Sequence, residues 1–180
     1  MKPLIIIGCG PSSKNFQIPI GFDCMCLNDS EKFISSRPNY LVCINSPNEF
    51  SPKERYDTIF STSADCVLSH LDIPLQDSNK LIKFHLGERS KCRLEVKECD
   101  FSSDSSYVVV MLAYKLGYTK IYLVGVDFIN HPFLSKRLEQ ISLEYEILYN
   151  KLKEKGIALW NLSELSLLTT VPKYNLLDLS

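Results

Sequence analysis

The sequence predicts an α/β fold with a doubly wound, mostly parallel sheet and helices on both faces. Short apolar runs rich in β-branched residues recur between polar, turn-rich segments, which is typical of parallel strands buried on both faces. Two helical patterns each end at a glycine, Gly117 and Gly156. Residues 107–160 alternate helix, strand, helix and strand, and such units form right-handed crossovers in a parallel sheet.

Six apolar runs are predicted as strands, and one more segment is a further candidate. The six are Leu4–Gly8, Asp23–Leu27, Tyr40–Ile44, Thr58–Phe60, Lys120–Val124 and Ile157–Trp160, and the further candidate is Leu81–Leu86. Apart from that candidate, residues 61–103 have no clean period, so we expect small helices or an irregular excursion there.

Two segments are predicted as helices. A nearly all-apolar stretch, Tyr107–Leu116, follows two serines and ends before Gly117, so we expect a buried helix. A second stretch, from about Ser135 to Lys155, repeats apolar residues at spacings of three and four and carries charged residues between them. That pattern predicts an amphipathic helix of the outer layer.

The bulk composition narrows the class of protein. The chain has 180 residues, of which 45% are hydrophobic and 23% charged, so residues 1–180 fit a single domain with a sizeable core. Its 20 basic and 21 acidic residues argue against electrostatic binding of nucleic acid. The run Leu4–Ile7 is too short for a signal peptide or a membrane span, and no other segment approaches 18 apolar residues. We expect a soluble cytoplasmic protein, and a homo-oligomer stays open.

The seven cysteines predict neither disulfides nor a metal site. Their number is odd, and they form no CxxC pair and no Cys/His group with the spacing of zinc ligands. We interpret them as reduced apolar side chains. A catalytic thiol and a metal ligand remain the alternatives.

Ligands of open α/β sheets bind beyond the carboxyl ends of the strands, near the point where the strand order reverses. The residues that follow each predicted strand are therefore the informative ones. After the first strand stands Gly8-Cys9-Gly10-Pro11-Ser12-Ser13, where the glycines let the backbone approach a ligand and the serines can donate to phosphate. No GK[ST] follows and only the first GxG of a GxGxxG is present, so a plain strand-to-helix turn is the alternative. We expect a valine at position 10 to block the ligand and leave the fold mostly intact.

Amides follow the next two strands. Asn28-Asp29-Ser30 and Asn45-Ser46-Pro47-Asn48 place one asparagine at each strand end, where its side chain can donate to and accept from a base or ribose. Asparagine is also common in turns, which is the alternative for both.

The remaining candidates lie at the second half of the chain. Asp104-Ser105-Ser106 opens the buried helix, where backbone N–H groups favour an anion or where Asp104 or Ser105 simply caps the helix. Asp127 follows the strand 120–124 and could bind ribose or act at the reacting centre, and a loop carboxylate is the alternative. His131 lies a few residues further on and could be a general base or a solvated loop histidine. No role is expected for His70 and His85.

Five segments, taken in order, resemble the bacterial sialyltransferases of glycosyltransferase family 42. They are IIIGCGPS at Ile5–Ser12, LN at Leu27–Asn28, INSP at Ile44–Pro47, DSS at Asp104–Ser106 and LGYTKIYLVGVDF at Leu116–Phe128. The chain is similar, more loosely, to other proteins with a GxGPS turn and an LGxxxIxLxGxD strand, which include archaeal hydroxymethylpterin pyrophosphokinases and uncharacterised phage proteins.

The resemblance implies a Rossmann-like fold that binds a CMP-sugar without a metal or other cofactor. Its implied nucleotide contacts are Gly8, Gly10, Ser12, Asn28, Asn45, Ser105 and Asp127. Two departures stand out. Asp104-Ser105-Ser106 stands where the family has Thr-Ser-Gly, and a carboxylate facing phosphate would repel it. The family inserts a lid with tyrosines and a catalytic histidine after the Asp127 strand, whereas this chain has only Phe128–Leu134, with Ile129 and Asn130 where tyrosines would contact the phosphate. The resemblance therefore implies a lidless relative.

The candidate site residues fall into two groups. The candidate nucleotide contacts are Gly8, Cys9, Gly10, Pro11, Ser12, Asn28, Asp29, Asn45, Ser46, Asp104, Ser105, Ser106 and Asp127, and the candidate catalytic residues are His131 and Asp127. The favoured function is metal-independent transfer of a glycosyl group from a nucleotide sugar. The alternatives are a non-catalytic nucleotide-binding module and an ATP-dependent pyrophosphokinase, which would need Asp127, Asp104 and Asp29 to converge on magnesium.

Overall fold

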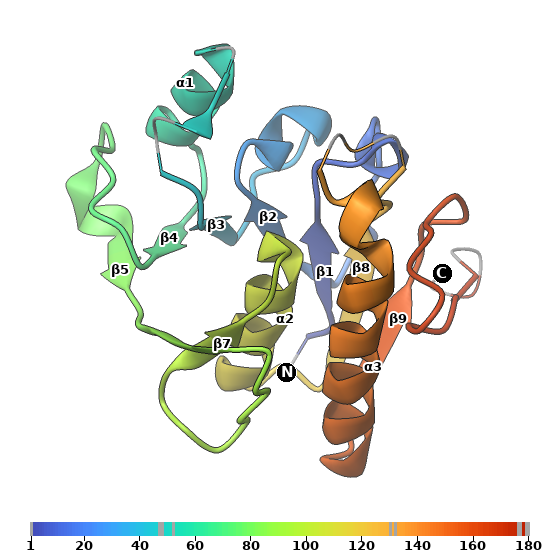
Figure 1. Ribbon diagram of the computed structural model, residues 1–180. Helices are drawn as coiled ribbons and strands as arrows, with labels where there is room; N and C mark the ends of the chain where they lie inside the picture. The colour runs from blue at the N-terminus through green and yellow to red at the C-terminus, as the bar shows by residue number, and fades with distance from the viewer. Residues whose placement is uncertain are drawn as a thin grey trace.

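The computed structural model describes residues 2–46, 49–51, 53–129, 131, 133–175 and 178, so Pro47, Asn48 and Asn130 lie outside it. It confirms the predicted fold class. Seven parallel strands form one sheet in the order β5-β4-β3-β2-β1-β8-β9 (Figure 1). Their bounds are β1 Leu4–Ile7, β2 Asp23–Leu27, β3 Tyr40–Cys43, β4 Cys66–Ser69, β5 Leu81–Lys83, β8 Lys120–Val124 and β9 Ala158–Asn161.

The sheet is buried on both faces, as the unbroken apolar runs of the strands require. In β1, Leu4 and Ile6 point into one hydrophobic cluster, while Ile5 and Ile7 point into the cluster on the opposite face. All four side chains are fully buried. A strand with both faces covered has no polar side to alternate with, which explains its near-continuous hydrophobicity.

Two helices cover one face of the sheet, α2 (Ser105–Lys115) and α3 (Leu138–Glu154) (Figure 1). Eight consecutive residues of α2, Ser106–Ala113, are buried, so this helix is a core element rather than an amphipathic one. α3 buries a single stripe that includes Tyr145, Leu148 and Leu152, and its opposite side faces solvent. The short helix η5 (Ser135–Arg137) directly precedes α3.

The other face is covered by shorter pieces. Ile59 and Tyr56 of α1 (Glu54–Phe60) pack there, together with Phe16 from the loop before β2 and Tyr174 near the end of the chain. Trp160 of β9 packs against Tyr174 with the ring centroids 5.3 Å apart and the ring planes tilted by 56°.

The strand order reverses at β1, and this reversal positions the candidate site. From β1 the chain runs outward through β2, β3, β4 and β5, and then returns so that β8 pairs with the free side of β1. The carboxyl ends of β1 and β8 therefore lie side by side at the reversal point, where open α/β sheets bind their ligands.

The excursion between β5 and α2 holds two strands that pair only with each other, β6 (Leu86–Arg89) and β7 (Cys99–Phe101). The prediction of one strand over Leu81–Leu86 is therefore only partly right, because that segment spans β5 and the first residue of β6. The predicted strand Thr58–Phe60 is wrong, since these residues form the last turn of α1. β4 and β7 were not predicted.

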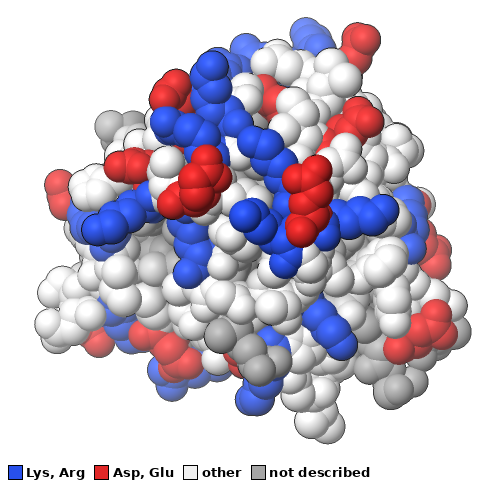
Figure 2. Space-filling model, turned by 90° about the horizontal axis from the view of Figure 1, so that it is seen from below, with Lys and Arg blue, Asp and Glu red and all other residues white. Residues whose placement is uncertain are grey.

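Charged side chains are mixed rather than segregated on the face at the amino ends of the strands. Figure 2 shows Lys and Arg side chains interspersed with Asp and Glu across that face. This agrees with the balanced composition and offers no single-sign patch there for a nucleic-acid backbone. All seven cysteines are free. No helix within the described ranges is long and apolar enough to cross a membrane.

Candidate functional site

The glycine-rich turn after β1 is bonded directly to the turn after β8. Gly8 N donates to Val124 O at 2.7 Å, and Gly10 N donates to Gly125 O at 2.7 Å. Ser12 N then donates to Asp127 Oδ2 at 2.8 Å. The two strand ends at the reversal point are thus joined into one unit. Pro11 opens the short helix η1 (Pro11–Ser13) and is exposed.

Gly10 is required by this junction. A Cβ at position 10 would lie 2.6 Å from Asp127 Oδ2 and 2.6 Å from Gly125 O, closer than real Cβ atoms come. The expectation that valine at position 10 would leave the fold intact is therefore wrong, because the added bulk meets the β8 turn.

Asp127 faces the protein interior rather than a ligand space. Its residue is 1% exposed, Oδ2 accepts from Ser12 N, and Oδ1 has no hydrogen-bond partner among the described residues. The next residue, Phe128, is buried and adopts φ +59°. A bulky side chain in the left-handed region costs energy and commonly marks a functional turn. Asp127 is thus placed to hold the turn that carries this strained residue.

The asparagines after β2 and β3 lie together. Asn28 Nδ2 donates to Asn45 Oδ1 at 3.0 Å, and Ile44 N donates to Asn28 Oδ1 at 3.3 Å. Asn28 adopts φ +52°, a conformation that asparagine tolerates better than most residues. Ser105, at the start of α2, donates from Oγ to Asn45 Oδ1 at 3.3 Å. The ends of β2, β3 and α2 therefore converge on Asn45.

Glu49, which no sequence signal indicated, occupies the donors beside Asn45. Asn45 Nδ2 donates to Glu49 Oε2 at 2.8 Å, and Ser46 N donates to Glu49 Oε1 at 3.3 Å. A carboxylate thus takes two donors that an anionic or carbonyl group of a ligand would otherwise use. Only a contact between loop residues reveals this, and no motif encodes it.

Asp29 is an anchor. It is 1% exposed and accepts two hydrogen bonds from the Arg55 guanidinium, at 3.0 and 2.7 Å, and one from Lys32. Burial alone would raise the pKa of Asp29, but the hydrogen bonds and charges of Arg55 and Lys32 outweigh it and hold that pKa below its usual range. Cys9 is exposed as a residue, but its thiol points at Asp29 Oδ1 and Leu27 O. Desolvation of the thiol and the charge of Asp29 raise its pKa to about 12, so it is not a ready nucleophile.

Asp104 also turns inward. Its carboxylate accepts from the Ser106 hydroxyl and from Tyr145 OH at 3.3 Å, and Ser106 Oγ lies 2.6 Å from Tyr145 OH. Burial raises the pKa of Asp104, and the hydrogen bonds of Ser106 and Tyr145 offset that rise only in part. The repulsion of a phosphate by Asp104 that the sequence led us to expect does not arise from this geometry, because the side chain packs against α3.

His131 lies on the loop between β8 and η5 and is exposed. Its Nδ1 accepts from Phe133 N at 3.3 Å and from Leu134 N at 3.1 Å. The Nδ1 atom of His131 is therefore occupied by two backbone donors, and acting as a base requires the ring to give up these two long contacts.

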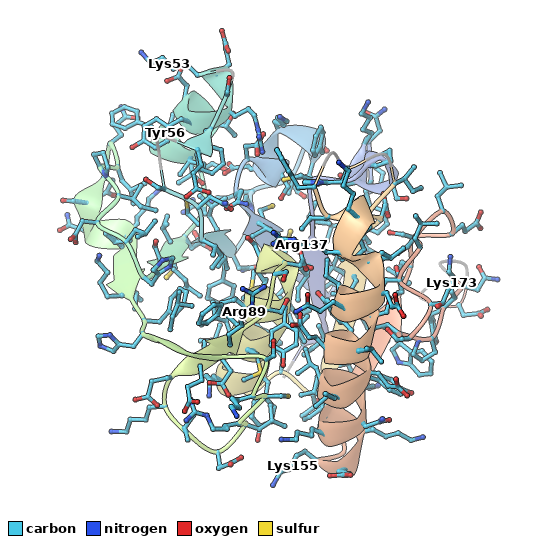
Figure 3. All side chains as sticks on the ribbon, viewed as in Figure 1. Lys53, Tyr56, Arg89, Arg137, Lys155 and Lys173 are labelled. Atoms are coloured by element: carbon cyan, nitrogen blue, oxygen red, sulfur yellow. The ribbon has the colours of Figure 1, made fainter. Side chains whose placement is uncertain are left out.

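A cation lies beside the start of α2. Arg89, at the end of β6, donates to the Ser103 hydroxyl, two residues before α2 begins. In the view of Figure 3, Arg89 lies over α2, and Arg137 lies near the amino end of α3. Arg89 is exposed, so its charge is available beside the amino end of α2.

The candidate contacts thus form two linked groups along one edge of the sheet. Gly8, Gly10, Ser12 and Asp127 make the β1–β8 junction, while Asn28, Asn45, Ser46 and Ser105 make the cluster at β2, β3 and α2. Cys9 Sγ, 3.4 Å from Leu27 O, connects the two. Asp29, Asp104 and Ser106 serve as supports. No group of three or more metal-ligating side chains occurs among the residues that the structure describes, and Asp127, Asp104 and Asp29 each bind other partners.

No protein-family model and no curated protein matches the sequence. Solved structures do match. The sialyltransferase CstII from Campylobacter jejuni with the substrate analogue CMP-3FNeuAc is 16% identical with a TM-score of 0.59, over 96% of this chain and 86% of that chain. The same enzyme with a trisaccharide acceptor and CMP is 18% identical with a TM-score of 0.60, over 97% and 86%. At such identities the likeness shows a sialyltransferase-like fold.

Proposed function

We propose that this chain binds a CMP-sugar at the carboxyl ends of β1, β2, β3 and β8 and transfers its glycosyl group to an acceptor hydroxyl. The observation that carries the proposal is the convergence of Asn28, Asn45 and Ser105 beside the β1–β8 junction, at the reversal of strand order. The fold is that of a sialyltransferase known with CMP and with a CMP-sugar analogue. The site and the fold together favour a glycosyltransferase that uses a CMP-sugar over other functions.

The side chains of this edge suit the parts of a CMP-sugar. The amides of Asn28 and Asn45 can both donate and accept, as a cytosine or ribose edge requires. Ser105 Oγ and the first N–H groups of α2 can donate to phosphate. Arg89, which is bonded to Ser103 beside the start of α2, would balance the phosphate charge, so we propose that no metal is needed. Glu49 has to leave Asn45 when the ligand enters.

We propose an inverting displacement. The acceptor oxygen forms a bond to the anomeric carbon while the bond from that carbon to the phosphate oxygen breaks, and CMP leaves with the electron pair. His131 takes the acceptor proton, after its Nδ1 contacts of 3.1 and 3.3 Å have been given up. Asp127 acts as a positioning residue through Ser12 N and not as the base. The lidless arrangement stays a prediction.

Titration calorimetry with CMP, UMP, GMP and AMP tests the proposal. We expect CMP to bind most tightly and Asn45→Ala to weaken it about tenfold or more, since one amide carries several ligand contacts. Asn79→Ala is the matched control, because Asn79 is exposed on η4 (Ser78–Lys80), away from the strand ends. Equal weakening by both variants, or no CMP binding at millimolar concentration, contradicts the proposal.

The second candidate function is a non-catalytic nucleotide-binding module. The hydrogen bonding of the two candidate bases favours it: Asp127 Oδ2 accepts from Ser12 N and His131 Nδ1 accepts from Leu134 N, so both atoms are already occupied. The two candidates differ in turnover. Release of free sugar from a CMP-sugar, lost in His131→Ala while CMP affinity is kept, supports the enzyme, and binding without any release supports the module.

A further inference from the structure

The outer side of α3 carries an apolar stripe that the fold leaves uncovered. Leu143 is 58% exposed and Ile147 is 45% exposed, one turn apart on the helix, while the opposite side of α3 packs on the sheet. Beside them Leu167, on the loop after β9, is 44% exposed. Surface helices normally keep such positions polar, so a contiguous apolar strip indicates an interaction surface.

A hollow of about 410 Å³ lies next to this stripe, between α3 and the loop after β9. Its lining combines three leucines with hydroxyls and two carboxylates: Leu138, Glu139, Ser142, Leu143, Glu146, Leu167, Thr169 and Thr170. The hollow can accept an apolar side chain, and its acidic rim favours a neighbouring cation on whatever enters.

α3 itself offers that combination in an antiparallel copy. Leu143 and Ile147 lie symmetrically about residue 145, so a two-fold pairing of α3 with itself sets each Leu143 against an Ile147. At 100° per residue, Glu139 and Lys153 lie on the same flank of the stripe, at opposite ends of the helix. In the antiparallel pair Glu139 of one copy therefore faces Lys153 of the other. The charges at the two ends of this flank are therefore complementary in the pair.

We infer that α3 is the dimer interface of this protein and that its occupant is a second copy of the chain. In the dimer, Ile147 of the partner subunit packs against Leu143, and Lys153 of the partner subunit pairs with Glu139. Glu146 lies on the same flank near the two-fold axis, where the two copies of this side chain repel each other.

This interface bears on the candidate site through the loop after β9. Leu167 N donates to Asp127 O at 2.9 Å, and Ser166 Oγ donates to Val126 O at 2.7 Å. Gly125 N donates to Ser163 Oγ at 2.9 Å. The same loop thus lines the hollow and holds the β8 turn, so dimer formation stabilises that turn. The effect of the dimer on the candidate site rests on the proposed function, whereas dimerisation itself does not.

Sedimentation equilibrium over a concentration series tests the inference. We expect a dimer for the natural chain and a monomer for Leu143→Glu/Ile147→Glu at the same concentration. The control is Ile20→Glu, since Ile20 is fully exposed on the loop before β2, far along the chain from α3. A natural chain that stays monomeric throughout, or a double variant that stays dimeric, overturns the inference.

Charge reversal provides a second test of the dimer that does not depend on the apolar variants. Glu139→Lys and Lys153→Glu should each weaken the dimer about tenfold, and the two together should restore it, because the pair is re-formed with opposite signs. Glu146→Gln should tighten the dimer by relieving the repulsion at the axis. Additive weakening in the Glu139→Lys/Lys153→Glu chain would show that these side chains do not meet and would overturn the antiparallel arrangement. CMP titration of the monomeric variant is read separately, so failure of the nucleotide proposal leaves the dimer result intact.

Discussion

Replacing Asp127 separates a positioning role from a catalytic one. Asp127→Ala removes the acceptor for Ser12 N, which the carboxylate holds at 2.8 Å, and frees the turn after β1 from the turn after β8. Asp127→Asn keeps an oxygen where Oδ2 stands. Only Asp127→Asn therefore keeps an acceptor for Ser12 N, whereas neither variant has a carboxylate that could act as a base.

The expected magnitudes follow from that bond. A hydrogen bond to a buried charged group contributes about 1.5–3 kcal/mol, so Asp127→Ala should lower the free energy of unfolding by about 2–3 kcal/mol. Asp127→Asn keeps a neutral bond and should cost about 1 kcal/mol. Urea unfolding followed by the fluorescence of Trp160, the one tryptophan of the chain, measures both.

Ligand binding and turnover complete this comparison. We expect Asp127→Ala to lose CMP affinity together with stability, and Asp127→Asn to keep most of its affinity and its turnover of a CMP-sugar. An Asp127→Asn chain that is as stable as the natural one and binds CMP normally, yet has lost turnover by a hundredfold or more, would refute the positioning role and make Asp127 the base.

Three further changes have defined outcomes. Gly10→Val should lower the free energy of unfolding by about 2–4 kcal/mol in urea and abolish CMP binding, because its Cβ meets Asp127 and Gly125; a fully stable variant contradicts this contact. Glu49→Gln should raise CMP affinity several-fold in calorimetry by weakening the contact that occupies Asn45, and reduced affinity would make Glu49 a ligand contact instead. Arg55→Ala should cost about 2–4 kcal/mol at neutral pH and flatten the acid limb of stability, which denaturation at several pH values measures. The sign follows from the lowered pKa of Asp29: its contribution is complete above about pH 4 and is lost as pH falls through the lowered pKa, so an acid limb as steep as that of the natural chain argues against the pair.

The fold could be predicted where the hydrophobic pattern of a segment matches its burial in the folded protein. β1 is a fully buried apolar run, and β2 and β8 are buried apolar runs after a first charged residue, and the predicted bounds of all three differ from the observed ones by at most a residue. The strand predicted at Thr58–Phe60 is wrong because Ile59 is the buried side of the short helix α1. Three residues are too few to distinguish a strand from a helical turn. β7 was missed because its middle residue, Asp100, places a carboxylate at a buried position where a strand usually has an apolar side chain. Arg93 binds this carboxylate.

The edge of the sheet was predictable, and the roles of its side chains only in part. Parallel strands place the residues after them on one edge, so Asn28, Asn45 and Asp127 had to come near one another. The direction in which a carboxylate points depends on partners far along the chain. Asp29 turns to Arg55 and Asp104 turns to Tyr145, and neither partner forms a motif with it.

A crystal structure of the chain soaked with CMP tests the central claim most directly. We predict the cytidine against Asn28 and Asn45, the phosphate at Ser105 and the amino end of α2, and Glu49 displaced from Asn45. CMP bound away from these strand ends, or Glu49 still bonded to Asn45 beside a fully occupied nucleotide, contradicts it.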